Sequence, residues 1–374
     1  MSLNLKKEYH PDYSQNPALA NWKRNGGKAI GYVCSTVPAE IIHAAGFFPI
    51  RLIGNRESVK LSREYFSSYS CYFAQSILES GLKEGSTLID GMVFCYKCDC
   101  MRFLSAAWER LVDLPYFYFL NNPHCGTVEG AETFFKEEIK KFVESLEAFS
   151  RSKISEESLF DSIQLYNQLR NCYQKIEELR YKSKISGSQA AELVLYGQMS
   201  PPSIAVERLN GIIFHDDFIP LPKNGPRLMV LGSVHPDLDI FHLVESLGGD
   251  IVADDLCMVG RCAEKEIDII ENDLFLSLSR FYLSERIQCP CMTTEGRFEQ
   301  RLDYITKRIK LGSVDGVVFT IQRYCDPHQL DYPDVNAVLT NDGIPTLLIE
   351  VEQSIYSESI KNRLEAFIEM LTAR

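Results

Sequence analysis

The first 120 residues alternate between short apolar runs and segments with helical spacing. The apolar runs predict strands at residues 28–33, 47–53, 88–95 and 115–120. One helix is predicted from Pro38 to Ala45, where Pro38 suits the first turn. A second opens at Cys71 and ends near Gly81, and a third follows Cys98. Because strands that alternate with helices favour a parallel sheet, this part is expected to be an α/β domain.

The pattern changes at Ala131, where apolar residues begin to recur at alternating steps of three and four. This spacing predicts long amphipathic helices as far as Gly197, with Ser155 as an N-cap. The helical segment shows no residues of evident chemistry. The run Met199–Pro202 is expected to end it, and residues 220–226, rich in proline, read as an interdomain linker.

A second α/β pattern begins at Arg227. The predicted strands are residues 227–231, 250–253, 316–321 and 346–351. Helices are predicted at residues 238–247, 275–285, 298–309 and 360–371, with a loop at 322–328. The predicted fold class is therefore α/β, with two Rossmann-like (doubly wound parallel sheet) domains and an intervening helical segment. The predicted boundaries are 1–128, 129–225 and 226–374.

Charge and hydropathy narrow the class of protein. A net charge of −12 over 374 residues argues against nucleic acid as a partner, since such proteins usually carry a basic face. No apolar run reaches membrane-spanning length, and the first residues lack the apolar core of a signal peptide. We therefore expect a cytoplasmic protein without a membrane partner.

Twelve cysteines are more than ordinary core packing needs, and disulfides are rare in a reducing compartment. Cys98 and Cys325 each follow an apolar strand, one in each half, and Cys71 opens a helix. Ligands of open α/β folds bind at the carboxyl ends of strands. Three thiolates that meet between the two domains would suffice for an iron–sulfur cluster with one iron left open. The alternative is three unrelated buried thiols.

Other residues carry weaker signals. The spacing Cys95-Tyr-Lys-Cys98 matches a CxxC pair, as in a thioredoxin-like site or half of a zinc site, but no second pair completes it. No phosphate-binding loop is present, so ATP, if used, binds to another protein. Acid–base or cluster-facing candidates, from their placement alone, are Ser35 with its neighbour Cys34, His43, and Glu352 or Glu350 at the end of the last strand.

Five stretches together resemble the 2-hydroxyacyl-CoA dehydratase D component family, which includes benzoyl-CoA reductase subunits. They are Gly31–Gly46 (GYVCSTVPAEIIHAAG), Ser70–Ser76 (SCYFAQS), Lys97–Asp99 (KCD), Val252–Cys257 (VADDLC) and Tyr324–Pro333 (YCDPHQLDYP). The resemblance covers nearly the whole chain in the same order. It implies two Rossmann-like domains and a [4Fe-4S] cluster bound by three cysteines, which match Cys71, Cys98 and Cys325.

The resemblance also implies a reaction and its partners. In this family a separate ATP-hydrolysing iron–sulfur activator delivers one electron to the cluster. The electron passes to an acyl-CoA thioester and gives a ketyl radical, from which the hydroxyl group leaves. An open iron suits this chemistry because it acts as a Lewis acid. The family pairs two homologous subunits, so a sister subunit or a homodimer is expected.

Three alternatives stay open. In the first two, the chain is a benzoyl-CoA reductase-type subunit or a double-cubane reductase. The double-cubane branch holds an [8Fe-9S] cluster with additional cysteines, for which Cys257, Cys289 and Cys291 are the implied ligands. The third alternative is a non-catalytic, zinc-stabilised scaffold protein, which would contain zinc without iron.

Overall fold

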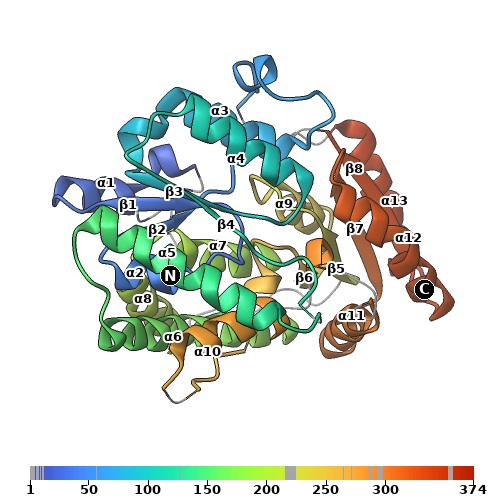
Figure 1. The fold of residues 1–374 in the computed structure, drawn as a ribbon. Coiled ribbons are helices and arrows are strands. Elements are labelled where there is room, and N and C mark those ends of the chain that lie inside the picture. The colour runs from blue at the N-terminus through green and yellow to red at the C-terminus, as the bar shows by residue number, and fades with distance from the viewer. Residues whose placement is uncertain are drawn as a thin grey trace.

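Two four-stranded parallel sheets, each flanked by helices, form the framework of the chain (Figure 1). The structure is a computed structural model. It describes residues 5, 8, 10, 12–55, 57–126, 128–214, 225–263, 265–270, 272–285, 289–292, 298–352 and 357–374. The predicted fold class of two doubly wound α/β units is confirmed.

The N-terminal sheet has the strand order β2-β1-β3-β4, with every pair parallel. Its strands are β1 (Ala29–Tyr32), β2 (Phe48–Arg51), β3 (Gly91–Cys95) and β4 (Tyr116–Leu120). Every residue of the first three strands is buried. A parallel sheet covered on both faces requires such continuous apolar runs, which is why the sequence located these strands.

The C-terminal sheet repeats the same topology, with the order β6-β5-β7-β8. Its strands are β5 (Arg227–Gly232), β6 (Asp250–Asp255), β7 (Gly316–Gln322) and β8 (Thr346–Val351). The strand order reverses between β1 and β3 in one sheet and between β5 and β7 in the other. These reversals create a crevice at the carboxyl ends of the strands, where open α/β folds bind ligands.

The helices of the N-terminal half are α1 (Pro17–Arg24), α2 (Ala39–Ala44), α3 (Tyr72–Leu88) and α4 (Asp99–Leu111). The expected end of α3 near Gly81 is wrong, because the helix continues for seven more residues to Leu88. Gly81 allows α3 to approach α4 instead: a Cβ atom there would lie 2.5 Å from the Trp108 ring. The glycine is a packing residue and not a helix stop.

The middle of the chain consists of helices α5 (Ala131–Ser150), α6 (Glu156–Tyr181), α7 (Gly187–Gln198) and α8 (Pro202–Phe214). The predicted N-cap of α6 is confirmed, since the hydroxyl of Ser155 accepts a hydrogen bond from Ser158 N at 3.0 Å. Pro202 begins α8 and does not end the helical region, because proline is tolerated in a first turn. Residues 220–224 of the predicted linker lie outside the described residues, and the domain boundaries stay a prediction.

The C-terminal helices are α9 (Asp239–Ser246), α10 (Leu274–Arg280), α11 (Phe298–Gly312), α12 (Asp326–Asn341) and α13 (Glu358–Thr372). Helix α10 continues as a π-helical turn, Phe281–Glu285, and short 3₁₀ turns occur at Tyr13–Gln15, Ser62–Glu64, Gly260–Cys262 and Pro290–Met292. The predicted loop at 322–328 is shorter than expected. Helix α12 starts at Asp326, with a proline in its first turn.

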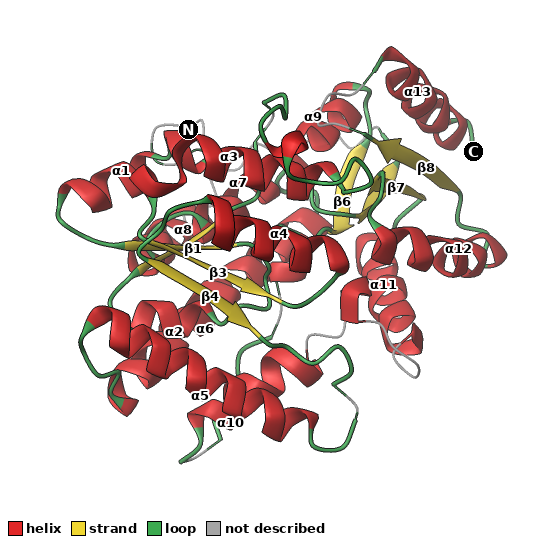
Figure 2. Cartoon of the chain, turned by 45° about the horizontal axis from the view of Figure 1, so that its top comes forward, coloured by secondary structure: helices red, strands yellow, loops and turns green. Residues whose placement is uncertain are grey.

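One segment crosses from the C-terminal half back to the N-terminal half. Helix α10 packs against α5, as Figure 2 shows. Ile267, Leu278 and Met292 belong to the same buried cluster as Ile30 of β1 and Val93 of β3. The described residues of this crossing segment (265–270, 272–285 and 289–292) include Cys289, which packs against the same cluster, and its neighbour Cys291. Within the described part of the chain, no helix combines the length and apolar character needed to cross a membrane.

Candidate metal centre and adjoining pocket

Three cysteines occupy the N-cap positions of three helices. Cys71 precedes α3, Cys98 precedes α4 and Cys325 precedes α12. Cys98 follows β3 by three residues and Cys325 follows β7 by three residues. The two strands therefore place their cysteines at equivalent points of the two sheets, at the carboxyl ends where ligands bind.

Cysteine is an unusual choice at these positions. N-caps favour Ser, Thr, Asp and Asn, whose oxygens accept hydrogen bonds from the first turn. None of the three thiols caps its helix in this way. A helix N-terminus carries partial positive charge and free N–H groups, which stabilise thiolates and other anions. The three helices therefore lack a stabilising side-chain cap at N-termini that suit an anionic ligand.

The three cysteines belong to a larger set of interacting sulfurs, which we call the six-thiol group: Cys71, Cys98, Cys100, Cys289, Cys291 and Cys325. The Cys71 and Cys100 thiols lie close enough to shift each other's pKa. Cys291 interacts in the same way with Cys98 and Cys289. Cys325 joins the group through charge interactions with Cys71, Cys100 and Cys289. The three predicted cysteines therefore lie within electrostatic range of one another and of three others.

Crowding and burial govern the proton affinity of these thiols. The hydrogen bond with Cys100, burial and the charge of Cys325 hold the pKa of Cys71 well above its usual range. Burial is the main cause that raises the pKa of Cys325 to about 12. Cys100 is the exception, because its hydrogen bond with Cys71 lowers its pKa to about 7. Without a compensating cation, Cys71, Cys289, Cys291 and Cys325 are therefore protonated at neutral pH.

The composition of the group fits a soft metal centre. Cationic metals attract thiolates and displace their protons, which removes the repulsion that raises these pKa values. Sulfur donors select iron–sulfur clusters, zinc or copper(I) over magnesium or calcium. Among the described residues, no three Cys, His, Asp or Glu side chains are arranged around a common metal position. The ligand roles of Cys71, Cys98 and Cys325 stay predictions, which their convergence supports.

Cys257 lies in a different environment. Its sulfur accepts a hydrogen bond from Nη2 of Arg51 at 2.9 Å and lies 3.5 Å from the Ser35 hydroxyl oxygen. Arg51 also donates to the Gln198 amide oxygen at 2.5 Å and approaches the Cys262 sulfur at 3.6 Å. Arg51 is 1% exposed and has no carboxylate partner among the described residues. Carbonyl oxygens of Val33 and Cys257, together with the Gln198 amide oxygen and the sulfurs, therefore accept the hydrogen bonds of this guanidinium.

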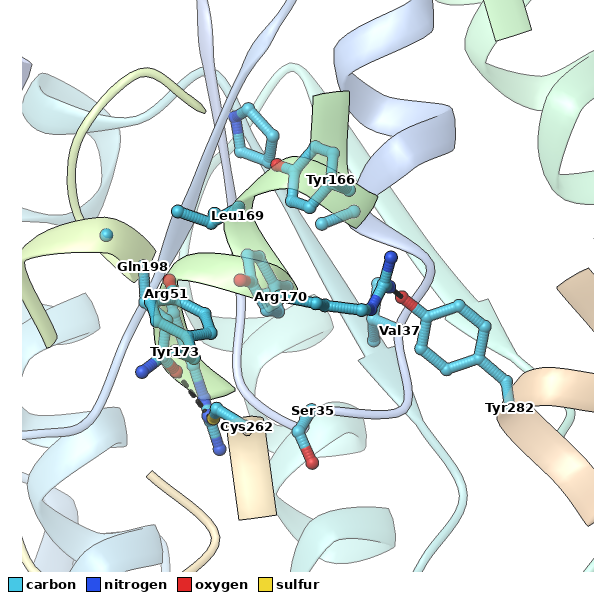
Figure 3. A pocket seen from close by; sticks show the side chains of 14 residues that line it. Ser35, Val37, Arg51, Tyr166, Leu169, Arg170, Tyr173, Gln198, Cys262 and Tyr282 are labelled. Carbon is cyan, nitrogen blue, oxygen red and sulfur yellow. Dashed lines mark hydrogen bonds between the residues drawn. The ribbon is translucent and has the colours of Figure 1, made fainter. Parts of the chain in front are cut away.

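A pocket of about 70 Å³ lies between β1, β2 and the central helices, lined in part by Ser35, Arg51 and Cys262 (Figure 3). Its walls combine aromatic and aliphatic side chains with polar groups: Tyr32, Ser35, Val37, Ala39, Pro49, Arg51, Tyr166, Leu169, Arg170, Tyr173, Gly197, Gln198, Cys262 and Tyr282. Arg170 is committed to an ion pair with Glu40, which also accepts a hydrogen bond from Tyr282 at 2.7 Å. The volume suffices for a few water molecules or a small part of a ligand.

The other predicted residues lie in separate places. Ser35 lines the pocket beside Arg51. His43 faces the helical segment, where its Nδ1 lies 2.9 Å from the Ser162 hydroxyl oxygen. Glu352 forms an exposed ion pair with Arg323, and its side chain is 65% exposed. The structure thus does not bring His43 or Glu352 together with the six-thiol group, and their catalytic roles stay predictions.

Sequence reasoning missed several residues of the site. Cys100 had a visible signal, because it is the third cysteine in the turn after β3. Arg51 stands inside an apolar strand, where a charged residue is unusual and calls for a buried partner. Gln198 and Lys97 gave no such signal. Lys97 is 3% exposed and donates to the Asn122 amide oxygen at 2.9 Å, close to the turn that carries Cys98.

Known proteins match this chain over nearly its whole length. Residues 34–371 match the family model 2-hydroxyglutaryl-CoA dehydratase, D-component. The (R)-phenyllactyl-CoA dehydratase beta subunit of Clostridium sporogenes is 25% identical over 367 residues, which are 96% of this chain and 97% of that protein. A benzoyl-CoA reductase subunit of Thauera aromatica is 26% identical over 364 residues, 95% and 94% of the two chains. The (R)-2-hydroxyglutaryl-CoA dehydratase beta subunit of Acidaminococcus fermentans is 25% identical over 380 residues, 99% and 100%.

Proposed function

Because the chain belongs to the 2-hydroxyglutaryl-CoA dehydratase D-component family, we propose that it is the iron–sulfur subunit of an ATP-activated, radical 2-hydroxyacyl-CoA dehydratase. The observation that carries the proposal is the placement of Cys71, Cys98 and Cys325, each at the N-cap of a helix. Two of these helices follow equivalent strands of the two sheets. The repeated placement supports a shared ligand between the halves.

The residues of the chain suit a [4Fe-4S] cluster held by these three cysteines. Such a cluster supplies one-electron reduction and, at an iron without a protein ligand, Lewis acidity. Three helix N-termini offset its negative charge. Cys100, Cys289 and Cys291 surround the three ligands with further sulfur, and the apolar side chains of the crossing segment keep water out. The protein thereby fixes the position and polarity of the centre.

The proposal includes partner proteins. A pocket of about 70 Å³ is too small for a CoA thioester, since sites for ligands of that size occupy hundreds of Å³. A binding site completed by a homologous sister subunit, or by a second copy of this chain, resolves the difference. The relatives, each of which is named as one subunit of an enzyme, support a sister subunit. The electron would come from a separate ATP-hydrolysing iron–sulfur activator.

Turnover with an activator tests the proposal. The anaerobically purified chain, its sister subunit, an activator protein and ATP are combined with a panel of 2-hydroxyacyl-CoA thioesters, and enoyl-CoA formation is measured. We expect ATP-dependent loss of water, abolished in Cys71→Ser and kept within about twofold in Cys172→Ser. Cys172 is a suitable control because it is a buried thiol in α6 outside the six-thiol group. Turnover without ATP, or full activity of Cys71→Ser, would contradict the proposal.

The six-thiol group also supports a second candidate, a reductase with a double-cubane [8Fe-9S] cluster. Cys289 and Cys291 are extra ligands implied by the sequence, and both join the group. Cys257 contacts Arg51, and Cys100 interacts with Cys71, so in this candidate Cys100 rather than Cys257 would be the sixth ligand. This candidate predicts about eight irons per chain, twice the content of a single cubane. Iron loss in Cys289→Ser, with Cys257→Ser unaffected, would favour it.

The reaction product and the bound metal distinguish the remaining alternatives. A benzoyl-CoA reductase-type subunit would reduce an aromatic thioester without loss of water, and the same assay detects that product. A scaffold protein would contain zinc without iron and would not respond to the activator. A cytoplasmic location is part of the proposal, because twelve cysteines in one chain suit a reducing compartment.

A further inference from the structure

A second pair of sulfurs lies beside the six-thiol group at the switch point of the N-terminal sheet. Strands β1 and β3 are parallel neighbours, with Gly31 opposite Met92 and Tyr32 opposite Val93. Cys34 follows the end of β1 by two residues, and Cys95 is the last residue of β3. Continuing the register of the two strands by two steps would pair Cys34 with Cys95. Neighbouring strands are about 4.8 Å apart, and disulfides join Cα atoms separated by roughly 4.4–6.8 Å, so such a pairing would suit a disulfide.

Side-chain contacts agree with this register. The thiols of Cys34 and Cys95 lie close enough for each to shift the other's pKa. The hydroxyl oxygen of Thr36, which is 2% exposed, lies 3.2 Å from the Cys34 sulfur and 3.1 Å from the Cys95 sulfur. One buried hydroxyl group therefore links both sulfurs and fixes their orientation.

The two thiols differ in access and in acidity. Cys34 is partly exposed, whereas Cys95 is buried. The hydrogen bond from Cys95, aided by the charge of Lys97 and by Thr36, holds the pKa of Cys34 well below its usual range. Burial and the bond to Cys34 raise the pKa of Cys95 well above its usual range. An accessible thiolate beside a buried thiol is the arrangement of an attacking and a resolving cysteine.

We propose that Cys34 and Cys95 form a reversible disulfide, a redox site separate from the metal centre, whose oxidant is a small-molecule disulfide such as glutathione disulfide. The Cys34 thiolate attacks one sulfur of the oxidant, forms a mixed disulfide and releases one thiolate. Cys95 loses its proton, attacks the Cys34 sulfur and releases the second thiolate. Two protein thiols are oxidised, and one disulfide is reduced to two thiols.

The position of the pair gives the disulfide a structural consequence. Cys34 directly precedes Ser35, which lines the pocket, and Cys95 is three residues before Cys98. A covalent bond between them ties the loop after β1 to the turn that leads into α4. The redox state of the pair therefore controls the mobility of the loop after β1 and of the turn before α4.

The test uses the full chain, purified without oxygen, incubated with glutathione disulfide, alkylated and mapped by peptide mass spectrometry. We expect a Cys34–Cys95 cross-linked peptide that dithiothreitol removes, while Cys172 is recovered as an alkylated thiol. Thr36→Val removes the hydroxyl group that contacts both sulfurs and is expected to slow formation of the cross-link. Recovery of Cys34 and Cys95 as free thiols, or a cross-link from Cys34 to Cys289 instead, would overturn the proposal. Iron content measured on the same samples reports on the metal centre independently.

Discussion

At the scale of single residues, the buried Arg51 and Asp255 are each compensated by neighbouring groups: polar oxygens, sulfur atoms or opposite charges. Arg51 is buried in the N-terminal sheet and is held by a carbonyl oxygen, an amide oxygen and the Cys257 sulfur. In the C-terminal half, Asp255 is buried between Arg261 and Arg301. These two arginines keep the pKa of Asp255 at about 2, despite burial, which acts in the opposite direction. Removing one partner of such a set leaves the others unsatisfied.

Substitution of Arg51 tests this interpretation. Arg51→Met removes the donor and leaves the Gln198 oxygen and the Cys257 sulfur without it, so we expect a loss of about 2–4 kcal/mol in the free energy of unfolding. Arg323→Met is the control. Arg323 forms an exposed ion pair with Glu352, and such pairs contribute at most about 1 kcal/mol. Urea unfolding of both variants measures the difference, and equal effects would contradict the assignment.

His235 predicts a pH dependence of stability. Burial lowers its pKa from 6.5 to about 4, so between these values the unfolded chain binds a proton that the folded chain does not. Stability from this group is complete above pH 6.5 and falls as the pH drops toward 4, by roughly 3 kcal/mol in total.

His235→Gln is the matched variant, because glutamine cannot titrate here and can retain the hydrogen bond that His235 Nε2 makes with the Thr320 hydroxyl group at 3.0 Å. Urea unfolding at pH 7 and pH 4.5 should show a smaller loss of stability in the variant than in the unchanged protein. An identical loss would show that His235 is protonated in the folded state.

At the scale of elements, close contact between helices decides boundaries that sequence patterns do not. Gly81 and Gly85 of α3 face Trp108 and Val112, and a Cβ at either glycine would come within 2.7 Å of these side chains. Glycine in a helix usually signals an end, which is why the sequence predicts too early an end for α3. Strands are located well because a buried parallel sheet imposes continuous apolar runs. Helix ends depend on neighbours that the sequence does not reveal.

Alanine at Gly81 should be destabilising although alanine favours helices. We expect Gly81→Ala to lower the free energy of unfolding by about 1–3 kcal/mol through overpacking against Trp108. The control is Gly211→Ala in α8, where a Cβ meets nothing within 4 Å. That change should raise stability by about 0.5–1 kcal/mol. Stabilisation by both substitutions would show that α3 and α4 are not in close contact.

The candidate site, like the helix ends, could be predicted only in part from the sequence. The position of Cys71, Cys98 and Cys325 at the starts of helices was predictable, because topology determines where strands end and helices begin. Their role as ligands stays a prediction. Cys100 was visible but unassigned. The position of Cys289 and Cys291 depends on the crossing segment, whose packing against the N-terminal core has no local sequence signal. Arg51 and Gln198 meet across 147 residues of sequence, and only the fold brings them together.

At the scale of the whole molecule, two copies of one sheet topology meet through helices that belong to neither sheet. Helix α6 contacts α2 of the first unit and β6 of the second, and the crossing segment returns to the first unit. Buried residues of both sheets, such as Phe94 and Val318, share one hydrophobic cluster. The two halves are therefore coupled mechanically, and the cysteines between them are held in place from both sides.

The most direct test of a cluster between the halves is the iron and acid-labile sulfide content of the anaerobically purified chain, compared with Cys325→Ser and Cys172→Ser. Cys325 is the ligand contributed by the C-terminal sheet, so its loss tests convergence itself. We predict about four irons and four sulfides per chain in the unchanged protein and in Cys172→Ser, and loss of most of both in Cys325→Ser. Zinc without iron in the unchanged protein, or full iron content in Cys325→Ser, would contradict the account.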